Sequence, residues 1–196
     1  MKKIGQLAAI LCLSVLTGCA GTNFKQLDSG QLAHGQDSAE SIKEKLGKPY
    51  AEGVITKNDK QFKTMTYAYA DTTGDAAYDG VTAARSQGFY FFDNKLVGDE
   101  FVSSWAVDLT DFDESKVSQI NKGSTTIREV EALLGQAGGE YSYPLVVNEN
   151  EKAKVYMYSQ TTGSAFNLEF YQKMLVVTYD QSGVVTDIEY TESGNK

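Results

Sequence analysis

The hydrophobic positions change rhythm along the chain, from a helical spacing to a strand-like alternation, and this change occurs twice. Ile42 and Leu46 lie four residues apart and are followed by Gly47. An apolar pair on one helix face with glycine after it predicts a short amphipathic helix that ends at the glycine. The same spacing recurs in residues 127–134, which predicts a second helix that ends at Gly135.

Each of these helices is expected to begin at a capping residue and to follow a shorter first helix. Asp37, with Glu40 three residues later, and Thr125 are good candidates for N-caps because their side-chain oxygens can accept bonds from the first turn. Residues 27–32 and 117–120 are interpreted as the short first helices. The pattern therefore predicts a helix-loop-helix in each half of the chain.

After each helix pair the pattern alternates and is rich in Tyr and Thr, which favours antiparallel strands joined by hairpin turns. The turns are expected at residues 93–95 and 180–183, where Asp, Asn and Gly gather. The expected strands cover residues 53–56, 63–69, 89–92 and 96–105 in the first half, and 143–147, 154–160, 168–179 and 184–190 in the second.

The two halves resemble one another at an offset of about 88 residues. We therefore expect an α+β fold of two tandem repeats, residues 24–108 and 112–192. Each repeat would be a helix-loop-helix packed on one face of a three- or four-stranded antiparallel sheet. The matching blocks are residues 32–35 with 120–123, 67–74 with 156–163, and 92–97 with 179–185.

The helical frame also carries a family resemblance. Residues 120–135 read I-x-x-G-x-T-x-x-x-x-V-x-x-x-L-G, and residues 32–49 have the same frame. This run resembles the helix-pair signature of the BamE-like (SmpA/OmlA) outer-membrane lipoproteins. It is equally similar to the domains of the β-lactamase inhibitor protein, which has two such repeats in tandem. The resemblance implies a fold and the binding of other envelope proteins, but no particular site, because the matched residues are structural.

Residues 1–18 have the pattern of a secretory signal peptide. Lys2 and Lys3 precede an apolar stretch, residues 7–16, that is too short for a stable membrane anchor. The stretch ends in Leu-Thr-Gly before Cys19, which resembles the bacterial lipobox. That resemblance implies cleavage before Cys19, diacylglycerol on its sulfur and an acylated (typically palmitate-bearing) new amino group, with residues 19–23 as a tether. The alternative is an ordinary signal peptide with a chance cysteine near the cleavage position.

The residue after the lipobox cysteine and the net charge bear on location. In enterobacteria an Asp at that position tends to retain lipoproteins in the inner membrane, and here it is Ala20. An outer-membrane, periplasm-facing location is therefore implied if the organism is Gram-negative. Loss of Lys2 and Lys3 takes the formal charge from −8 to −10. So acidic a chain is not expected to bind nucleic acid or to be drawn to anionic headgroups.

The composition offers little catalytic chemistry. The chain has one His and two Cys, and Cys12 leaves with the signal peptide, so no zinc site, disulfide framework or cofactor is expected. We interpret His34 as a polar residue at a helix end, in preference to a proton switch or a metal ligand. The acidic residues 108, 111, 113 and 114 lack the spacing of a calcium loop and are expected to form a solvated junction.

The tyrosines carry the binding hypothesis. Tyr67, Tyr69, Tyr156 and Tyr158 occupy equivalent alternate positions in the two halves, so each pair shares one face of its strand. An open face would give a protein-binding surface, since tyrosine offers a large area and a hydroxyl at low entropic cost. The alternative is that this face packs on the helices. The open face is our working interpretation.

These features favour a non-enzymatic envelope lipoprotein that binds another envelope protein, as an assembly-accessory or inhibitor-like module. One alternative is a scaffold lipoprotein that supports outer-membrane integrity. Another is an enzyme that cleaves envelope carbohydrate through a pair of carboxylates. A carboxylate pair in a cleft would favour the enzyme, and an open aromatic sheet would favour the binding module.

Overall fold

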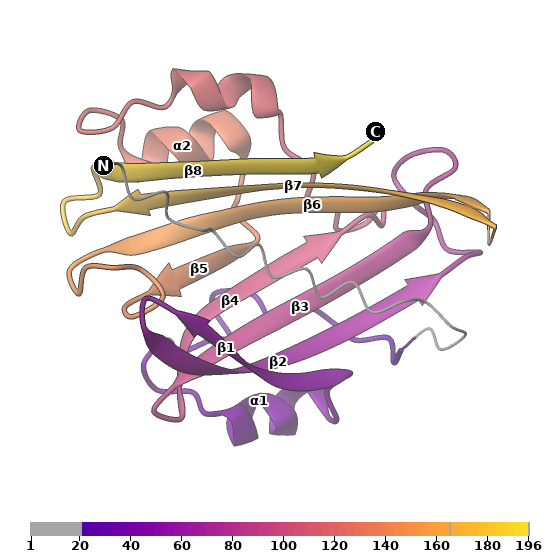
Figure 1. Cartoon of the computed structure of the whole chain (residues 1–196), viewed down its shortest axis with the longest axis horizontal. Coiled ribbons are helices and arrows are strands. Elements are labelled where there is room, and N and C mark those ends of the chain that lie inside the picture. Colours follow the sequence, from indigo (N-terminus) through magenta and orange to yellow (C-terminus); the bar gives the residue numbers. More distant parts are fainter. Residues whose placement is uncertain (1–20, 165, 196) are drawn as a thin grey trace.

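The computed structural model describes residues 21–164 and 166–195, which form an antiparallel sheet of eight strands (Figure 1). The strands cross the sheet in chain order, so each pairs with the strands before and after it. Their bounds are β1 Ala51–Lys57, β2 Lys60–Asp71, β3 Ala83–Phe92, β4 Lys95–Ser103, β5 Gly139–Ser142, β6 Lys152–Ser164, β7 Asn167–Tyr179 and β8 Val185–Gly194.

Two α-helices of equal length, α1 Ala39–Leu46 and α2 Ile127–Leu134, precede β1 and β5. Both end at a glycine, as the sequence predicts. The φ angles of Gly47 and Gly135 are 79° and 87°. Side chains with a Cβ rarely adopt this region, so the two glycines are confirmed as helix-ending residues.

Each helix begins one residue later than expected. Ser38 caps α1 in place of Asp37, and Thr126 caps α2 in place of Thr125. Both form capping boxes, in which side chain and backbone satisfy each other across the first turn. The Asp37 carboxylate instead accepts a hydrogen bond from the Ala33 N–H at 2.8 Å, which closes the preceding turn.

The helix-loop-helix prediction is wrong in both halves. Residues 27–32 are irregular apart from a turn at 29–31, where the Asp28 carboxylate accepts a hydrogen bond from the Gly30 N–H at 2.9 Å. Such local side-chain bonds compete with helix formation. In the second half, Glu114–Gln119 forms a 3₁₀ helix, η1, and no α-helix.

The predicted fold class, with two separate sheets of three or four strands, is also wrong. β4 and β5 pair from Gly98 with Tyr141 to Glu100 with Gly139, so the two halves share one continuous, curled sheet. A Cβ at residue 139 would lie 2.1 Å from the Asp99 carbonyl oxygen, so this close strand approach requires glycine. Strand pairing between distant segments leaves no periodic signal in the sequence.

The expected strand at residues 143–147 is a loop. β5 ends at Ser142, and Pro144 has no N–H for a ladder hydrogen bond. Asn58, in the turn between β1 and β2, donates hydrogen bonds to the carbonyls of Pro144 and Leu145, both at 3.1 Å. These two hydrogen bonds therefore attach the loop to the turn between β1 and β2.

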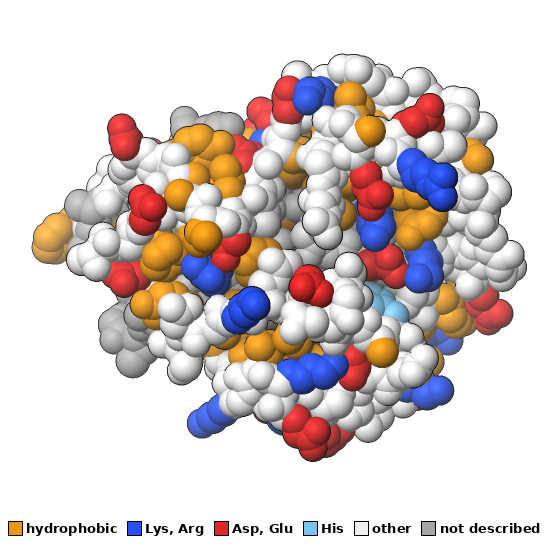
Figure 2. All heavy atoms as spheres, turned by 180° about the vertical axis from the view of Figure 1, so that it is seen from behind, with side chains coloured by type: hydrophobic (Ala, Val, Ile, Leu, Met, Phe, Trp, Pro, Cys, Tyr) orange, Lys and Arg blue, Asp and Glu red, His pale blue; other side chains and the backbone are white. Residues whose placement is uncertain are grey.

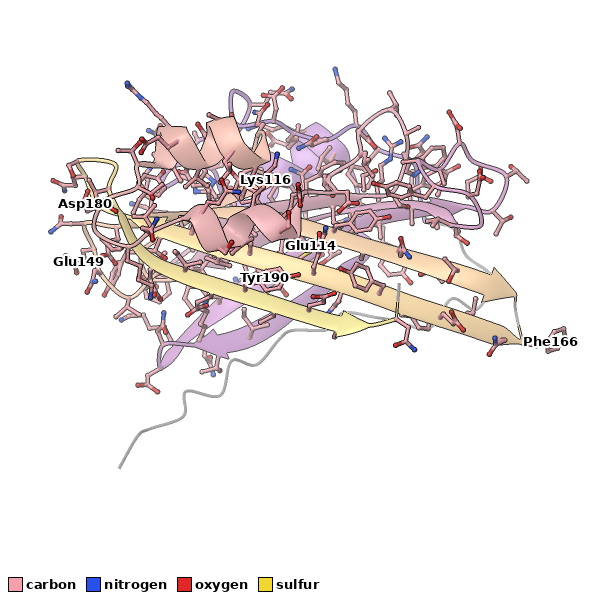
Figure 3. All side chains as sticks on the ribbon, turned by 90° about the horizontal axis from the view of Figure 1, so that it is seen from above. Glu114, Lys116, Glu149, Phe166, Asp180 and Tyr190 are labelled. Atoms are coloured by element: carbon pink, nitrogen blue, oxygen red, sulfur yellow. The ribbon has the colours of Figure 1, made fainter. Side chains whose placement is uncertain are left out.

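Both helices lie on the same side of the sheet (Figure 3). Buried side chains form three clusters: one packs under α1, one packs under α2, and the third lies on the opposite face of the sheet and joins the two halves. The α1 cluster contains Phe24, Leu27, Ile42, Met65, Tyr67, Phe89, Phe91, Leu96 and Phe101. The α2 cluster contains Phe112, Ile120, Val130, Tyr156, Leu175, Val177 and Val185, and the third contains Phe62, Val97, Tyr141, Leu145, Val146, Ala153 and Val155.

Among the described residues, no helix has the length and apolar character needed to cross a bilayer.

Candidate functional site

The structure buries most of the tyrosines that the sequence proposed as a binding surface. Tyr67, Tyr156 and Tyr158 are each at most 3% exposed. Tyr69 is half-buried and stacks on Trp105, with ring centroids 5.9 Å apart. The face of β2 and β6 that carries them is the face on which the helices pack. The interpretation of an open tyrosine face is therefore wrong.

Two of these tyrosines satisfy helix ends instead. The hydroxyl of Tyr67 donates to the Gly47 carbonyl at 2.8 Å, and that of Tyr156 donates to the Gly135 carbonyl at 3.1 Å. Carbonyls in the last turn of a helix have no partner within the helix, so these bonds join each helix to the sheet. Burial raises the pKa of Tyr67 to about 12, which keeps the donating proton in place.

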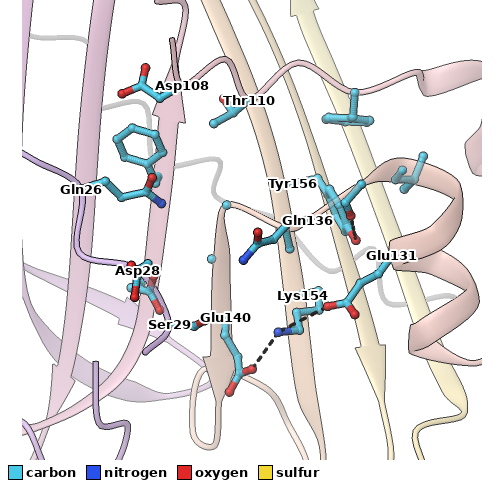
Figure 4. A pocket seen from close by; sticks show the side chains of 18 of the residues that line it. Gln26, Asp28, Ser29, Asp108, Thr110, Glu131, Gln136, Glu140, Lys154 and Tyr156 are labelled. Atoms are coloured by element: carbon cyan, nitrogen blue, oxygen red, sulfur yellow. Dashed lines mark hydrogen bonds and ion pairs between the residues drawn. The ribbon is translucent and has the colours of Figure 1, made fainter. Parts of the chain in front are cut away.

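A groove of about 790 Å³ lies on this face of the sheet, beside α2 (Figures 2 and 4). Strands β4, β5 and β6 form its floor, through side chains that include Asp99, Glu140 and Lys154. Three segments form its walls: residues 26–29, 32 and 34, which precede α1; residues 108–112; and the end of α2 with the four residues that follow it. The groove thus lies where the two halves of the sheet meet.

Charged side chains pair across the floor of the groove. The Glu140 carboxylate lies 2.8 Å from the Lys152 ammonium and 3.2 Å from that of Lys154, and Lys154 also lies 3.7 Å from Glu131 of α2 (Figure 4). In the sheet register, Glu140 stands opposite Asp99 on one side and Lys154 on the other. Opposite charges at cross-strand positions stabilise each other's placement.

His34 reaches the same floor from the segment before α1. Its Nε2 lies 2.8 Å from Asp99 Oδ1, and both side chains are largely buried. Within the part of the chain that the structure describes, Nδ1 is buried without a hydrogen-bond partner, so Asp99 orients the ring. The residue lies in a turn held by the Gly35 N–H and the Leu96 carbonyl, at 2.7 Å. This corrects the interpretation of His34 as a residue at a helix end.

The two central carboxyl groups have pKa values shifted in opposite directions. Burial raises the pKa of Asp99, and the contact with His34 offsets only part of that effect. Burial also opposes the ionisation of Glu140, but the Lys152 and Lys154 ammonium groups outweigh it and hold the pKa of Glu140 below its usual value. Neighbouring carboxyls with divergent pKa values are a feature of acid–base sites.

The acidic junction is paired with cations from the sheet. The Lys173 ammonium lies 2.7 Å from Asp111 and 2.5 Å from Glu114, and Asp108 lies 2.9 Å from Arg85. The prediction of a solvated junction is therefore wrong for Asp108 and Asp111, whereas Asp113 is exposed and Glu114 is partly exposed. Across residues 21–164 and 166–195, no group of three or more His, Cys, Asp or Glu side chains is arranged to hold a metal ion.

Sequence reasoning missed the residues that line the floor: Asp99, Glu140, Lys152 and Lys154. The alternation of two lysines with Ala153 and Val155 was the available signal, because it marks a strand with one polar face. Their pairing with Glu140 depends on strand register. The lipobox residue Cys19 and the signal peptide, residues 1–18, lie outside the described residues.

Comparisons with known proteins add little. No protein-family model and no curated protein matches the chain, so the BamE-like resemblance gains no support. Among solved structures, a Streptococcus mutans protein described as a candidate β-lactamase inhibitor protein is similar over 79% of this chain and 82% of its own, with 12% identity and a TM-score of 0.40. So weak a similarity supports no conclusion about this chain.

Proposed function

We propose that this protein is an acylated envelope lipoprotein whose groove binds a polar segment of another envelope protein. The groove between the two halves carries the proposal. Its volume of about 790 Å³ is that of a ligand site, but such sites for small molecules are lined mainly by apolar side chains. Here the floor consists largely of Asp99, Glu140, Lys152 and Lys154, which favours a ligand with its own charges and hydrogen-bonding groups.

Charged groups of a ligand can replace the ion pairs of the groove. Lys152 and Glu131 are partly exposed, so their present ion pairs are of low strength. A bound segment with both acidic and basic groups can replace these contacts without leaving a buried charge unpaired. Charge complementarity of this kind mainly determines specificity and association rate.

Acylation at Cys19 would keep the groove close to its partner in the envelope. Two or three acyl chains hold a protein on a membrane stably, whereas one does not. The proposed location is the outer membrane, facing the periplasm, if the organism is Gram-negative. Cys19→Ala should abolish palmitate incorporation and release the protein from membranes, and labelling that persists in this variant would contradict the assignment.

Site-specific crosslinking tests the groove. A photoreactive residue at Gln136, an exposed position in the groove wall, should capture a protein in intact envelopes. Lys154→Glu should abolish the crosslink, because it reverses a charge on the floor. Lys122→Glu is the matched control, since Lys122 is an exposed lysine paired with Asp187 outside the groove. A crosslink that survives Lys154→Glu, or disappears equally in the control, would contradict the proposal.

The second candidate is hydrolysis of envelope carbohydrate, and the divergent pKa values of Asp99 and Glu140 favour it. A carboxyl with a raised pKa beside one with a lowered pKa is the arrangement that a glycosidase uses for its general acid and its second carboxylate. Against it, both oxygens of Glu140 already contact lysines. New reducing ends from peptidoglycan that disappear in both Asp99→Asn and Glu140→Gln would support the enzyme over the binding module.

A further inference from the structure

Four strands of the sheet end at the same edge of the molecule. Neighbouring strands are antiparallel throughout, so β2, β4, β6 and β8 run in the same direction and their carboxyl ends lie on the same side (Figure 1). We call this edge the hairpin end. It comprises the turn between β6 and β7 with the start of β7, the loop of residues 72–82 and residues 104–107.

The described chain begins at the hairpin end. Gly21 forms a backbone bridge with Tyr69, which is two residues before the end of β2. Cys19 precedes Gly21 by only two residues, and an extended chain covers at most about 3.6 Å per residue, so a tether of this length reaches at most about 7 Å. Acyl chains on Cys19 would therefore place this end of the sheet directly against the bilayer.

Large apolar side chains are exposed at the same end. Phe166 is fully exposed and projects beyond the ends of β6 and β7 (Figure 3). Leu168 and Phe170 follow at alternate positions of β7, so they share one face of the strand, and both are exposed. Val107, in the segment after β4, is 82% exposed. Exposed apolar residues gathered in this way mark an interaction surface.

Backbone hydrogen bonds brace these segments against one another. The Thr82 N–H donates to the Thr161 carbonyl at 2.9 Å, which ties the 72–82 loop to β6. The Ala106 N–H donates to the Asp75 carbonyl at 3.0 Å, which ties the segment that carries Val107 to the same loop. These segments are therefore held at the same end of the sheet.

We propose that the hairpin end is a membrane-contacting surface, in which Phe166, Leu168 and Phe170 enter the interfacial region of the bilayer that holds the acyl chains. This inference rests on the proposed acylation of Cys19. The short tether selects the bilayer as the occupant, because it keeps this end at the membrane whatever else the protein binds. Residues 155–172 contain no Lys or Arg, so the contact depends on apolar burial and not on anionic headgroups.

Contact at both the tether and the hairpin would set the orientation of the molecule. The strands β6 and β7 would point their shared turn into the headgroup region. The groove is built on the face of β4, β5 and β6 that carries the helices and not on the ends of these strands, so it would remain open to a partner in the aqueous space. Anchoring would thus use one end of the sheet, and partner binding would use one of its faces.

Single-cysteine labelling of the acylated full-length protein tests the contact. The mature chain has no free thiol once Cys19 is acylated, so Phe166→Cys provides a unique position for an environment-sensitive fluorophore. Val147→Cys is the control, because Val147 is an exposed apolar residue in the loop at the opposite edge, where β6 begins. The protein is reconstituted in vesicles of phosphatidylcholine, with and without added phosphatidylglycerol.

We expect a blue-shifted emission at position 166 and quenching by lipids that carry a shallow nitroxide, with neither effect at position 147. Added phosphatidylglycerol should not strengthen the signal. Replacing Leu168 and Phe170 by Ser in the labelled protein should reduce the quenching towards the level of the control position. Circular dichroism should remain unchanged, since all the altered side chains are exposed.

Each other outcome overturns the inference. A label at position 166 that stays in water while the protein floats with the vesicles contradicts membrane contact and leaves the acylation standing. Shielding that depends on protein concentration without vesicles makes a second copy of the chain the occupant. Loss of flotation together with an unmodified Cys19, measured by mass, overturns the acylation and this inference with it.

Discussion

The half of the sheet around α1 and the half around α2 use the same contact to attach their helices. Tyr67 bonds to the carbonyl of Gly47, and Tyr156 bonds to that of Gly135. In each half the next tyrosine of that face, two residues later, stands opposite a cation on the following strand. The cation is Arg85 in the first half and Lys173 in the second. The two cations have very different surroundings.

Arg85 keeps some contact with solvent, whereas Lys173 is almost fully buried. The Arg85 guanidinium contacts Asp108 at 2.9 Å and the Trp105 ring at 4.8 Å, and its side chain is 12% exposed. Lys173 is 1% exposed and contacts two carboxylates and the ring of Phe112 at 4.6 Å. Its ammonium also donates to the Phe112 carbonyl. The pKa of Lys173 is raised because its carboxylate partners outweigh burial.

The difference between the two cations follows from how each half attaches the chain segment that precedes its helix to the sheet. In the first half the buried amide of Gln87 does this, since it accepts from the Leu27 N–H at 3.0 Å and donates to the Leu27 carbonyl at 2.8 Å. In the second half the segment before η1 is held by Lys173. Matching scaffolds thus fix their incoming segments with a neutral amide in one case and a buried charge in the other.

The largest expected effect is therefore at Lys173. Lys173→Met should lower the free energy of unfolding by about 3–5 kcal/mol, because it leaves the largely buried Asp111 carboxylate and the Phe112 carbonyl without their cation. Urea unfolding measured by circular dichroism gives this value. Adding Asp111→Asn and Glu114→Gln to Lys173→Met should recover part of the loss.

The same substitution in the other half is the matched comparison. Arg85→Met should cost about 1 kcal/mol, since Asp108 is partly exposed and water can hydrate it. Equal losses for Arg85→Met and Lys173→Met would contradict the distinction between the halves.

Local features of the fold were predictable from sequence, and the features that join the halves were not. Gly47 and Gly135 end their helices because a single residue determines the backbone there. The pairing of β4 with β5 depends on contacts between distant segments. The apparent first helix at residues 27–32 is lost to a side-chain bond of Asp28, which no periodicity reveals.

The site was harder to predict because both faces of the sheet are buried. Tyr156 packs under α2, but Val155 on the opposite face lies in the third cluster. An alternating strand shows which residues share a face and not which face carries the helices. The choice between an open and a covered tyrosine face was therefore undetermined until the helices were placed. The groove residues were visible only as alternating charges.

The helix-ending glycines provide the next largest effect. Gly47→Val and Gly135→Val should each lower the free energy of unfolding by about 1–3 kcal/mol, because valine is strained at positive φ. A Cβ at either position meets no atom within 4 Å, so backbone strain alone is responsible. The two losses should be similar in thermal or urea unfolding, and no loss at either site would contradict the assigned backbone.

The tyrosine contacts should contribute less. Tyr67→Phe and Tyr156→Phe each remove one hydrogen bond to a helix-ending carbonyl and keep the ring, so each should cost about 1 kcal/mol. Hydrogen exchange of the adjoining helix should increase in the same variant and stay unchanged in the other helix. An increase in both helices would show that the two attachments are not independent.

The smallest effect lies at the boundary between the halves, where Asp99 of β4 faces Glu140 of β5. Because the folded-state pKa of Glu140 is lowered, its contribution to stability is present above the unfolded value of 4.5 and is lost as the pH falls through the folded value. Glu140→Gln should therefore lower the free energy of unfolding by at most about 1 kcal/mol near neutral pH and have no effect in strong acid.

The pH dependence of stability that Asp99 causes has the opposite sign. The folded-state pKa of Asp99 is raised, so wild type loses stability as the pH rises from the unfolded value of 3.8 through the folded value. Asp99→Asn should remove that loss, and urea unfolding of both variants across the acidic range distinguishes the two slopes. Parallel pH profiles for the two variants would show that these carboxyls do not differ in environment, which would also remove the observation that favours the enzymatic candidate.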